Sequence, residues 1–260
     1  MKNVWNSFKI AFSMYSKIPM PYADWTAENM QYAMCFFPLI GAVIGVVMTL
    51  LATVMPLLPF HHSLKTVLYL LVPILITGGI HIDGFLDTCD ALSSWQPIER
   101  RLEILKDPHT GAFAIISAIS YYLLAFGIWS EAGRESVWIL SIGFVLSRAM
   151  SGYSVVTFRM AKNSGLAATF SEKAKKKRVR QVMVVYFIVI SIAMILVNWL
   201  LGVVAITAAL LVFWYYHRTS YKNFGGITGD LAGYFLCLCE LFMAIAVIIV
   251  ENIAGSMGIL

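Results

Sequence analysis

The chain has 260 residues, of which 60% are hydrophobic and only 13% are charged, and its formal net charge is +5. An average soluble domain carries about 25% charged residues, so this composition excludes an ordinary soluble protein and indicates an integral membrane protein. The small positive balance favours attraction to an anionic membrane leaflet over nucleic-acid binding.

The first segment is predicted to be a short interfacial helix, because Trp5, Phe8, Phe12 and Tyr15 recur at helical spacing. Several apolar runs follow this segment. Their lengths approach or exceed the roughly 20 residues that a helix needs to cross a bilayer. We therefore expect an all-α, polytopic membrane bundle of about seven transmembrane helices, within a range of six to eight, forming one domain over residues 1–260. The runs fall near residues 33–58, 64–80, 111–130, 136–157, 181–201, 203–217 and 231–250.

The second and sixth of these runs are short, and the turn near Leu201 and Gly202 that separates the fifth from the sixth is tight. A transmembrane helix needs about 20 apolar residues, so a broken or re-entrant helix is the expected source of any miscount.

Basic residues gather on one side of this predicted topology. If the N-terminus lies in the cytoplasm, 16 Lys and Arg residues fall in inner segments and only Lys65 and Arg134 in outer ones, with Arg148 inside a span. Cytoplasmic loops of membrane proteins carry such an excess. We therefore expect a multi-pass protein of the cell (inner, cytoplasmic) membrane, with an active site that faces the cytoplasm.

The stretch GGIHIDGFLDTCDAL, residues 78–92, places Asp83, Asp87 and Asp90 at positions i, i+4 and i+7, on one side of a helix. Like charges at this spacing destabilise a helix with nothing bound. Oxygen ligands on one stripe suit a hard cation such as Mg²⁺. We interpret the three aspartates, which are expected to converge on one point, as metal ligands and catalytic residues; the alternative is the solvated face of a loop helix.

Two further stretches, KDPHTGAF (106–113) and GGITGDLAG (225–233), place Asp107 and Asp230 directly before predicted spans. Both are candidate catalytic residues, although Asp230 on local evidence also fits an ordinary helix N-cap. Glycine-rich turns at helix N-termini present backbone N–H groups to anions. The predicted substrate-binding residues are Lys17, His81, Lys106, Arg148, Gly225, Gly226 and Glu240.

Arg148 and Glu240 are the only formal charges deep within predicted spans, at similar depth. They can pair as a structural ion pair or contact substrate, and both interpretations stay open. On an ideal helix His81 lies nearly opposite the aspartates, which leaves catalytic support or packing as its role. The polar segment FRMAKNSGL, residues 158–166, is predicted to be able to close over a ligand.

Several stretches that occur together in one order resemble the cobalamin synthase family. They are FSMYSKIPMP (12–21), FFPLIGAVIG (36–45), GGIHIDGFLDTCDAL (78–92), EILKDPHTGAF (103–113), Arg148 and GGITGDLAGYFLCLCE (225–240). The chain departs from the pattern common in that family at Lys17, Ala91, Pro108 and His109.

The resemblance implies a membrane enzyme that transfers the phosphoryl group of adenosylcobinamide-GDP to α-ribazole or its 5'-phosphate, releases GMP and needs Mg²⁺. Attack of a ribose hydroxyl on a pyrophosphate suits metal ions held by carboxylates. In this interpretation Asp83, Asp87 and Asp90 hold Mg²⁺, and Asp107 or Asp230 completes the shell or accepts the proton. The basic groups expected to contact phosphate are Lys17, Lys106 and Arg148.

Two other functions are compatible with these features. A membrane phosphotransferase that uses a CDP-alcohol donor has similar chemistry, although its usual Asp-Gly spacing with an Ala-Arg dipeptide is missing here. A cation transporter would place acids near the bilayer midplane, whereas most of the singled-out acids lie at one predicted membrane edge. The expected partners are the two substrates and the lipid bilayer, without nucleic acid, and a homo-oligomer is compatible with the sequence.

Overall fold

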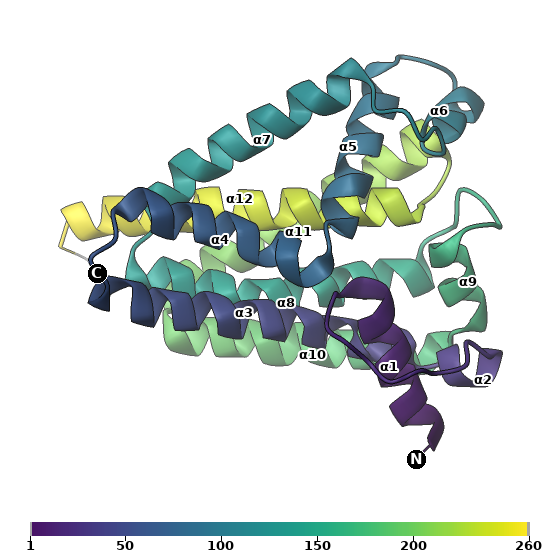
Figure 1. Ribbon diagram of the computed structural model, residues 1–260, viewed down its shortest axis with the longest axis horizontal. Coiled ribbons are helices and arrows are strands. Elements are labelled where there is room, and N and C mark those ends of the chain that lie inside the picture. The colour runs from purple at the N-terminus through teal and green to yellow at the C-terminus, as the bar shows by residue number, and fades with distance from the viewer. Residues whose placement is uncertain (1, 259–260) are drawn as a thin grey trace.

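Apolar segments in a bilayer fold into helices because a backbone surrounded by hydrocarbon must satisfy its own hydrogen bonds. The computed structural model, which describes residues 2–258, confirms an all-α bundle over that range. Several long helices run side by side along the molecule (Figure 1). They are α3 (Phe37–Val54), α8 (Arg134–Thr157), α10 (Lys176–Val197), α11 (Trp199–Phe224) and α12 (Gly229–Ser256).

The shorter elements gather mainly at one end of this bundle, while α4 and the inclined α7 lie along it (Figure 1). Short 3₁₀ turns extend α3 at both of its ends. The remaining elements are α1 (Lys2–Tyr15), α2 (Ala27–Met30), η1 (Ala33–Phe36), η2 (Met55–Leu57), α4 (His62–Thr77), α5 (Ile80–Ser93), α6 (Ile98–Ile104), α7 (Ala112–Ser130) and α9 (Leu166–Lys173).

Helix α8 forms the centre of the bundle and packs against α3, α10 and α12. Most of its side chains are buried. Close approach of α3 depends on small residues: a Cβ atom on Gly45 would lie 2.3 Å from the carbonyl oxygen of Ser141. Glycine at helix contacts is the usual way in which membrane helices pack closely.

Six helices are long and apolar enough to cross a membrane, and the number rises to seven if the bent pair α4 and α5 counts as one span. This agrees with the predicted range. The expected broken helix is confirmed at the second span, where α4 ends at Thr77 and α5 leaves at an angle of 97°. Gly78 and Gly79 make this turn with φ values of +69° and +81°, which glycine adopts without steric cost.

The prediction of a short sixth span is wrong. Helix α11 covers 26 residues, from Trp199 to Phe224, because helical hydrogen bonds continue after the side chains become polar near His217. The break between α10 and α11 also lies earlier than the predicted turn. It falls at Asn198, whose side-chain oxygen accepts a hydrogen bond from the backbone N–H of Leu201 at 3.0 Å and so caps α11.

The N-terminal helix is confirmed as α1, but its aromatic stripe mainly faces the protein. The ring of Phe8 lies 5.6 Å from that of Phe36, and Phe12 is buried. Trp5 stays 56% exposed. The stripe that predicted an interfacial helix therefore largely attaches α1 to the bundle, because η1 and the start of α3 supply an apolar surface beside it.

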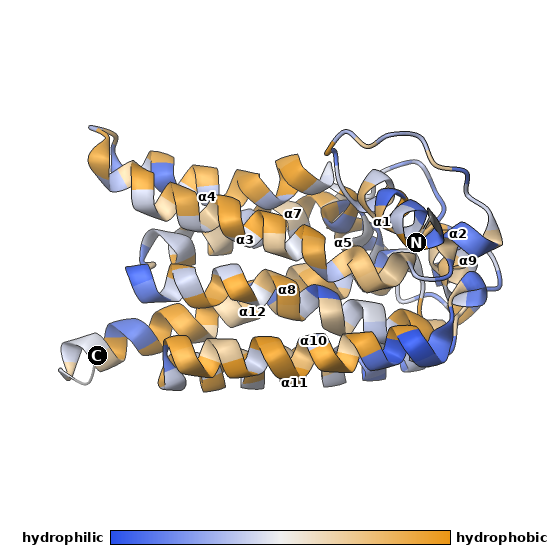
Figure 2. Ribbon diagram, turned by 90° about the horizontal axis from the view of Figure 1, so that it is seen from below, coloured by the Kyte–Doolittle hydropathy of each residue, from blue (hydrophilic) through white to orange (hydrophobic). Residues whose placement is uncertain are grey.

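Hydrophilic residues concentrate at the end of the bundle that carries α1, α2, α9 and the start of α10 (Figure 2). Helices α5, α6 and α9, which lie in the segments predicted to be cytoplasmic, are also at this end (Figure 1). At the opposite end, Glu251 links α12 to the start of α8. Its carboxylate accepts hydrogen bonds from the backbone N–H groups of Gly133 and Ser136. A negative charge is favourable at such a helix start.

Helices α5 and α12 cross at glycine residues from both sides. A Cβ atom on Gly84 of α5 would lie 2.8 Å from the Cα atom of Asp230, and one on Gly233 of α12 would lie 2.8 Å from the carbonyl oxygen of His81. Side chains at either position would push the two backbones apart. The crossing therefore sets the distance between the first turns of α5 and α12.

The substitution Gly84→Ala is expected to lower the thermal unfolding temperature of the detergent-solubilised protein by several degrees. The added methyl group would overlap the backbone of α12, and overpacking of this kind costs about 1–3 kcal/mol. Gly127→Ala on α7 is the matched control, since a Cβ atom there meets nothing within 4 Å and alanine is the better helix former. An unchanged unfolding temperature for Gly84→Ala would contradict this helix crossing.

Candidate active site

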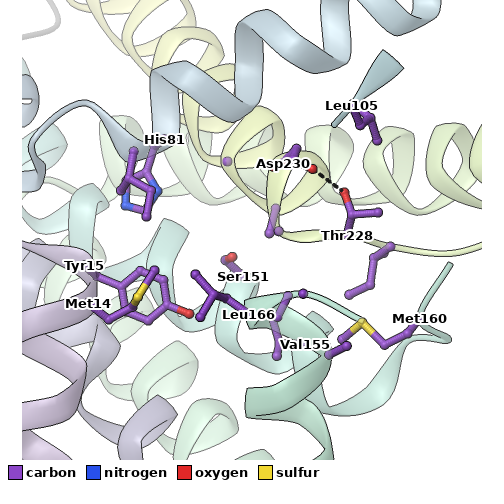
Figure 3. A pocket seen from close by; sticks show the side chains of 18 of the residues that line it. Met14, Tyr15, His81, Leu105, Ser151, Val155, Met160, Leu166, Thr228 and Asp230 are labelled. Atoms are coloured by element: carbon purple, nitrogen blue, oxygen red, sulfur yellow. Dashed lines mark hydrogen bonds between the residues drawn. The ribbon is translucent and has the colours of Figure 1, made fainter. Parts of the chain in front are cut away.

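A cavity of about 390 Å³ lies at the hydrophilic end of the bundle. Residues of α1, α5, α8, α9 and α12 contribute to its wall, together with the loops before α9 and α12. Its two ends differ in character (Figure 3). Met14, Tyr15 and His81 lie at one end, whereas Thr228 and Asp230 lie at the other.

Two carboxylates from different helices face this cavity, Asp83 from α5 and Asp230 from the first turn of α12. The hydroxyl of Thr228 donates a hydrogen bond to Asp230 Oδ2 at 3.3 Å and accepts one from the backbone N–H of Leu231 at 3.2 Å. Asp230 is thus held beside the N-cap of α12. The N-cap position, which the local sequence suggested for Asp230, belongs to Thr228.

The helix predicted to carry the three clustered aspartates is confirmed as α5. Asp87 lies one turn beyond Asp83, where the charges of Asp83, Asp230 and Asp90 all act on it. Within residues 2–258, none of these four carboxylates forms an ion pair with a basic side chain. Negative charge without a direct ion-pair partner among these residues is therefore concentrated where α5 meets α12.

The three aspartates of α5 do not converge on one point. Positions i and i+7 are about 10 Å apart along a helix, so a shared stripe does not bring all three carboxylates together. Asp90 instead lies beside Gly111 at the start of α7, where an added Cβ atom would clash with both carboxylate oxygens. The positive end of the α7 helix favours a carboxylate there.

In the described part of the chain, no group of three His, Cys, Asp or Glu side chains is arranged to hold a metal ion. Mg²⁺ does not require such a cage, because it is commonly held by one or two carboxylates together with waters and substrate phosphates. Asp83 and Asp230 supply two carboxylates on one cavity. The donor set therefore fits a Mg²⁺ ion whose coordination is completed by a phosphate ester.

Two lysines line the same cavity, Lys106 and Lys162. Burial lowers the pKa of Lys162 and the nearby charge of Lys106 lowers it further, whereas Asp230 acts in the opposite direction. A bound anion would relieve this crowding of positive charge. Lys106 was a predicted phosphate contact. Lys162 was not named, although it lies in the segment 158–166 that was predicted to close over a ligand.

The predicted phosphate-binding glycines, Gly225 and Gly226, do not line this cavity. Gly225 ends α11 with φ of +72°, and a Cβ atom on Gly226 would clash with the backbone of residues 159–161. Two backbone hydrogen bonds, of 2.8 and 2.9 Å, join Ile227 to the same segment. The glycines therefore bring two loops together, and the residues that follow each loop reach one cavity wall.

Asp107 lies on an exposed loop outside the cavity lining. Its carboxylate accepts hydrogen bonds from the backbone N–H of His109 at 3.0 Å and from His109 Nδ1 at 2.7 Å. These bonds lower the pKa of Asp107, which makes the carboxylate a weaker proton acceptor. Of the two acids suggested to act with the α5 cluster, the geometry favours Asp230.

His81 and Asp83 both line this cavity, although an ideal helix places their side chains on nearly opposite faces. The cavity contacts the first turn of α5, so side chains on different faces of that turn can reach it. Lys17, by contrast, does not line the cavity. Its aliphatic stem lies across Gly78, and its backbone N–H donates to the carbonyl of Ile76 at 2.7 Å.

Arg148 and Glu240 form the predicted ion pair, with 2.6 Å between Arg148 Nη1 and Glu240 Oε1. The Arg148 guanidinium also donates to the carbonyl of Phe144 at 3.0 Å and to Ser147 Oγ at 3.2 Å. The Arg148 side chain is 1% exposed. The pair borders a separate cavity of about 70 Å³, so its position favours a structural role over substrate contact.

The substitution Glu240→Gln is expected to destabilise the protein by about 3–5 kcal/mol, because it leaves the Arg148 charge buried without its partner. Thermal unfolding in detergent measures this loss. The double variant Arg148→Met, Glu240→Met should recover much of the stability, since an apolar pair removes both charges. A fully stable Glu240→Gln variant with weakened substrate binding would instead indicate substrate contact.

The fold and the cavity together define a polytopic α-helical membrane protein with acidic and basic side chains facing one pocket at the hydrophilic end of its bundle. The family model described as cobalamin-5-phosphate synthase matches residues 7–248. The chain belongs to this family, and the predicted resemblance is confirmed. It is an enzyme of cobalamin biosynthesis, as the sequence predicted.

Relatives over nearly the whole chain carry the name adenosylcobinamide-GDP ribazoletransferase. The protein of that name from Lachnoclostridium phytofermentans is 53% identical over 248 residues and covers 95% of both chains. One from Clostridium botulinum is 32% identical, covering 93% of this chain and 96% of its own. One from Clostridium perfringens is 34% identical, covering 92% and 96%. No solved structure matches the chain.

Proposed function

We propose that this protein joins adenosylcobinamide-GDP to α-ribazole, or to α-ribazole 5'-phosphate, and releases GMP. The names of the relatives support the donor and the ribazole transfer. One observation supports placing this reaction in the cavity: Asp83, Asp230, Lys106 and Lys162 all line it. Carboxylates and lysines together suit a pyrophosphate substrate and a metal ion.

In the proposed reaction, the oxygen of an acceptor ribose hydroxyl forms a bond to the phosphorus that carries the adenosylcobinamide group. The bond from that phosphorus to the bridging oxygen breaks, and GMP leaves with the oxygen. Asp230 accepts the hydroxyl proton, because it lines the cavity and is held in place by Thr228. Lys106 and Lys162 bind phosphate oxygens through charge-assisted hydrogen bonds.

We propose Mg²⁺ as the cofactor, held by Asp83 together with phosphate oxygens of the donor, with the negative charge of Asp87 nearby. Bound there, the ion would neutralise negative charge on the oxygens of the attacked phosphoryl group and of the leaving phosphate. Binding would also offset the repulsion among carboxylates that have no basic partner within the described residues. Asp90, beside the start of α7, would contribute mainly through its charge.

The proposed site faces the cytoplasm of a bacterial cell. The cavity is lined by residues of α1, α5 and α9, helices that lie at the hydrophilic end of the bundle (Figure 2). The predicted inner segments carry nearly all Lys and Arg residues. Such a bias sets membrane orientation. Helices around the site would hold an amphipathic corrinoid donor at the membrane surface while its pyrophosphate reaches the cavity.

Product analysis of the purified protein tests the proposed function. Incubation with adenosylcobinamide-GDP and α-ribazole should release GMP in step with formation of the joined corrinoid. EDTA should stop the reaction and excess Mg²⁺ should restore it, because the carboxylate cluster needs a cation to bind the pyrophosphate. Release of CMP from a CDP-alcohol, or ion flux without nucleotide cleavage, would contradict the proposal in favour of the other two functions.

The substitution Asp83→Asn is expected to lower kcat by at least about 100-fold, since it removes one of two carboxylates that face the cavity. The variant should still insert into the membrane and unfold at a temperature near that of the wild type. Asp24→Asn, at an exposed position of the N-terminal segment, is the matched control and should stay active. Near-normal turnover of Asp83→Asn would remove this residue from the mechanism.

A further inference from the structure

We propose that the apolar end of the cavity binds the fused-ring base of the acceptor nucleoside, while the charged end receives the pyrophosphate of the donor. This inference rests on the function proposed above and assigns the two ends of one cavity to two substrates. The apolar end consists of Met14, Tyr15, Met34 and Phe37, with His81 at its border.

The apolar end is lined by aromatic rings and soft methionine side chains. The rings of Tyr15 and Phe37 lie 4.6 Å apart, and the His81 ring stacks on Tyr15 at 6.4 Å with an interplanar angle of 23°. Flat rings and methionine thioethers make favourable contacts with a further aromatic ring. This end therefore suits a planar ligand with little polarity.

Few polar atoms face this end, and two of them lack good partners. His81 Nε2 is buried and has no hydrogen-bond partner among the described residues. The partner recorded for the Tyr15 hydroxyl is Met34 Sδ, at 3.9 Å, and a thioether is a weak acceptor. A ligand with one ring nitrogen would satisfy the buried His81 Nε2, which has no other partner among the described residues.

The chemistry of the two bases decides which of them occupies this end. Guanine carries several donors and acceptors along its edge, and leaving them without partners in an apolar site is costly. The benzimidazole of α-ribazole has an apolar outer edge and a single free ring nitrogen. The few polar atoms at this end match the benzimidazole and not the guanine.

The size of the cavity limits which part of the two substrates it can enclose. A volume of about 390 Å³ lies within the roughly 300–1,000 Å³ of pockets that enclose drug-sized ligands. A nucleoside is a ligand of this class, whereas a corrin ring with its amide side chains is far larger. With the base among Tyr15 and Phe37, the ribose would lie near Ser151, between the two ends (Figure 3), and its hydroxyl would point toward Asp230.

The first test uses the wild-type, full-length protein in detergent without donor or Mg²⁺. Labelled α-ribazole should bind in equilibrium dialysis, because its base site does not depend on the charged end. Unlabelled benzimidazole riboside should displace it, whereas guanosine at the same concentration should not. Failure of α-ribazole to bind, or equal displacement by guanosine, would overturn the assignment.

The second test is the substitution Tyr15→Ala, which should weaken α-ribazole binding by about tenfold or more through loss of the stacked ring. The KM for the acceptor should rise by a similar factor while the KM for the donor stays within about twofold. Tyr15→Phe keeps the ring and should bind nearly as the wild type does. Tyr22→Ala, at a side chain 85% exposed on the same N-terminal segment, is the control and should change neither constant.

A rise in donor KM alone for Tyr15→Ala, or unchanged α-ribazole binding, would contradict the assignment. These binding measurements require no turnover, so they report on the base site even if the wild type forms no product. A wild-type protein that forms no product would contradict the proposed function and not the base site. If Tyr15→Ala unfolds, the displacement experiment on the wild type still decides between the two bases.

Discussion

The close crossing of α5 and α12 is the contact on which the site depends. Gly84 and Gly233 bring the first turns of the two helices within backbone contact, and Asp83 and Asp230 therefore face the same cavity. The contact holds two carboxylates near each other, with Asp87 and Asp90 further along α5. The glycine contacts bring the two backbones together at a place where these carboxylates repel one another.

Two sets of charged groups in this protein have different surroundings. Arg148 and Glu240 are paired in the bundle interior, where the guanidinium has further oxygen partners, as a charge far from water requires. The acids and lysines of the cavity lie at the hydrophilic end, where water and ligands can reach them. Burial therefore separates charges that hold the bundle together from charges available for chemistry.

The sequence predicted the helical class and the number of spans because the length and apolarity of a segment determine whether it can cross a bilayer. It was less accurate where one helix passes from an apolar to a polar environment. Helix α11 continues through polar residues to Phe224, and the aromatic stripe of α1 packs largely against protein. Hydropathy records which side chains prefer hydrocarbon and does not record which neighbour covers them.

From the sequence alone came the family resemblance and the helix that carries Asp83, since each depends on residue types and their spacing. The sequence left open whether Arg148 and Glu240 pair, and the structure decided that they do. Only the tertiary structure shows that Asp230 and Lys162 line the same cavity as Asp83. It also shows that the Asp107 carboxylate bonds to His109 within an exposed loop. These contacts join segments far apart along the chain. Their distances follow from how closely helices can pack and how loops pair, which spacing within one helix does not specify.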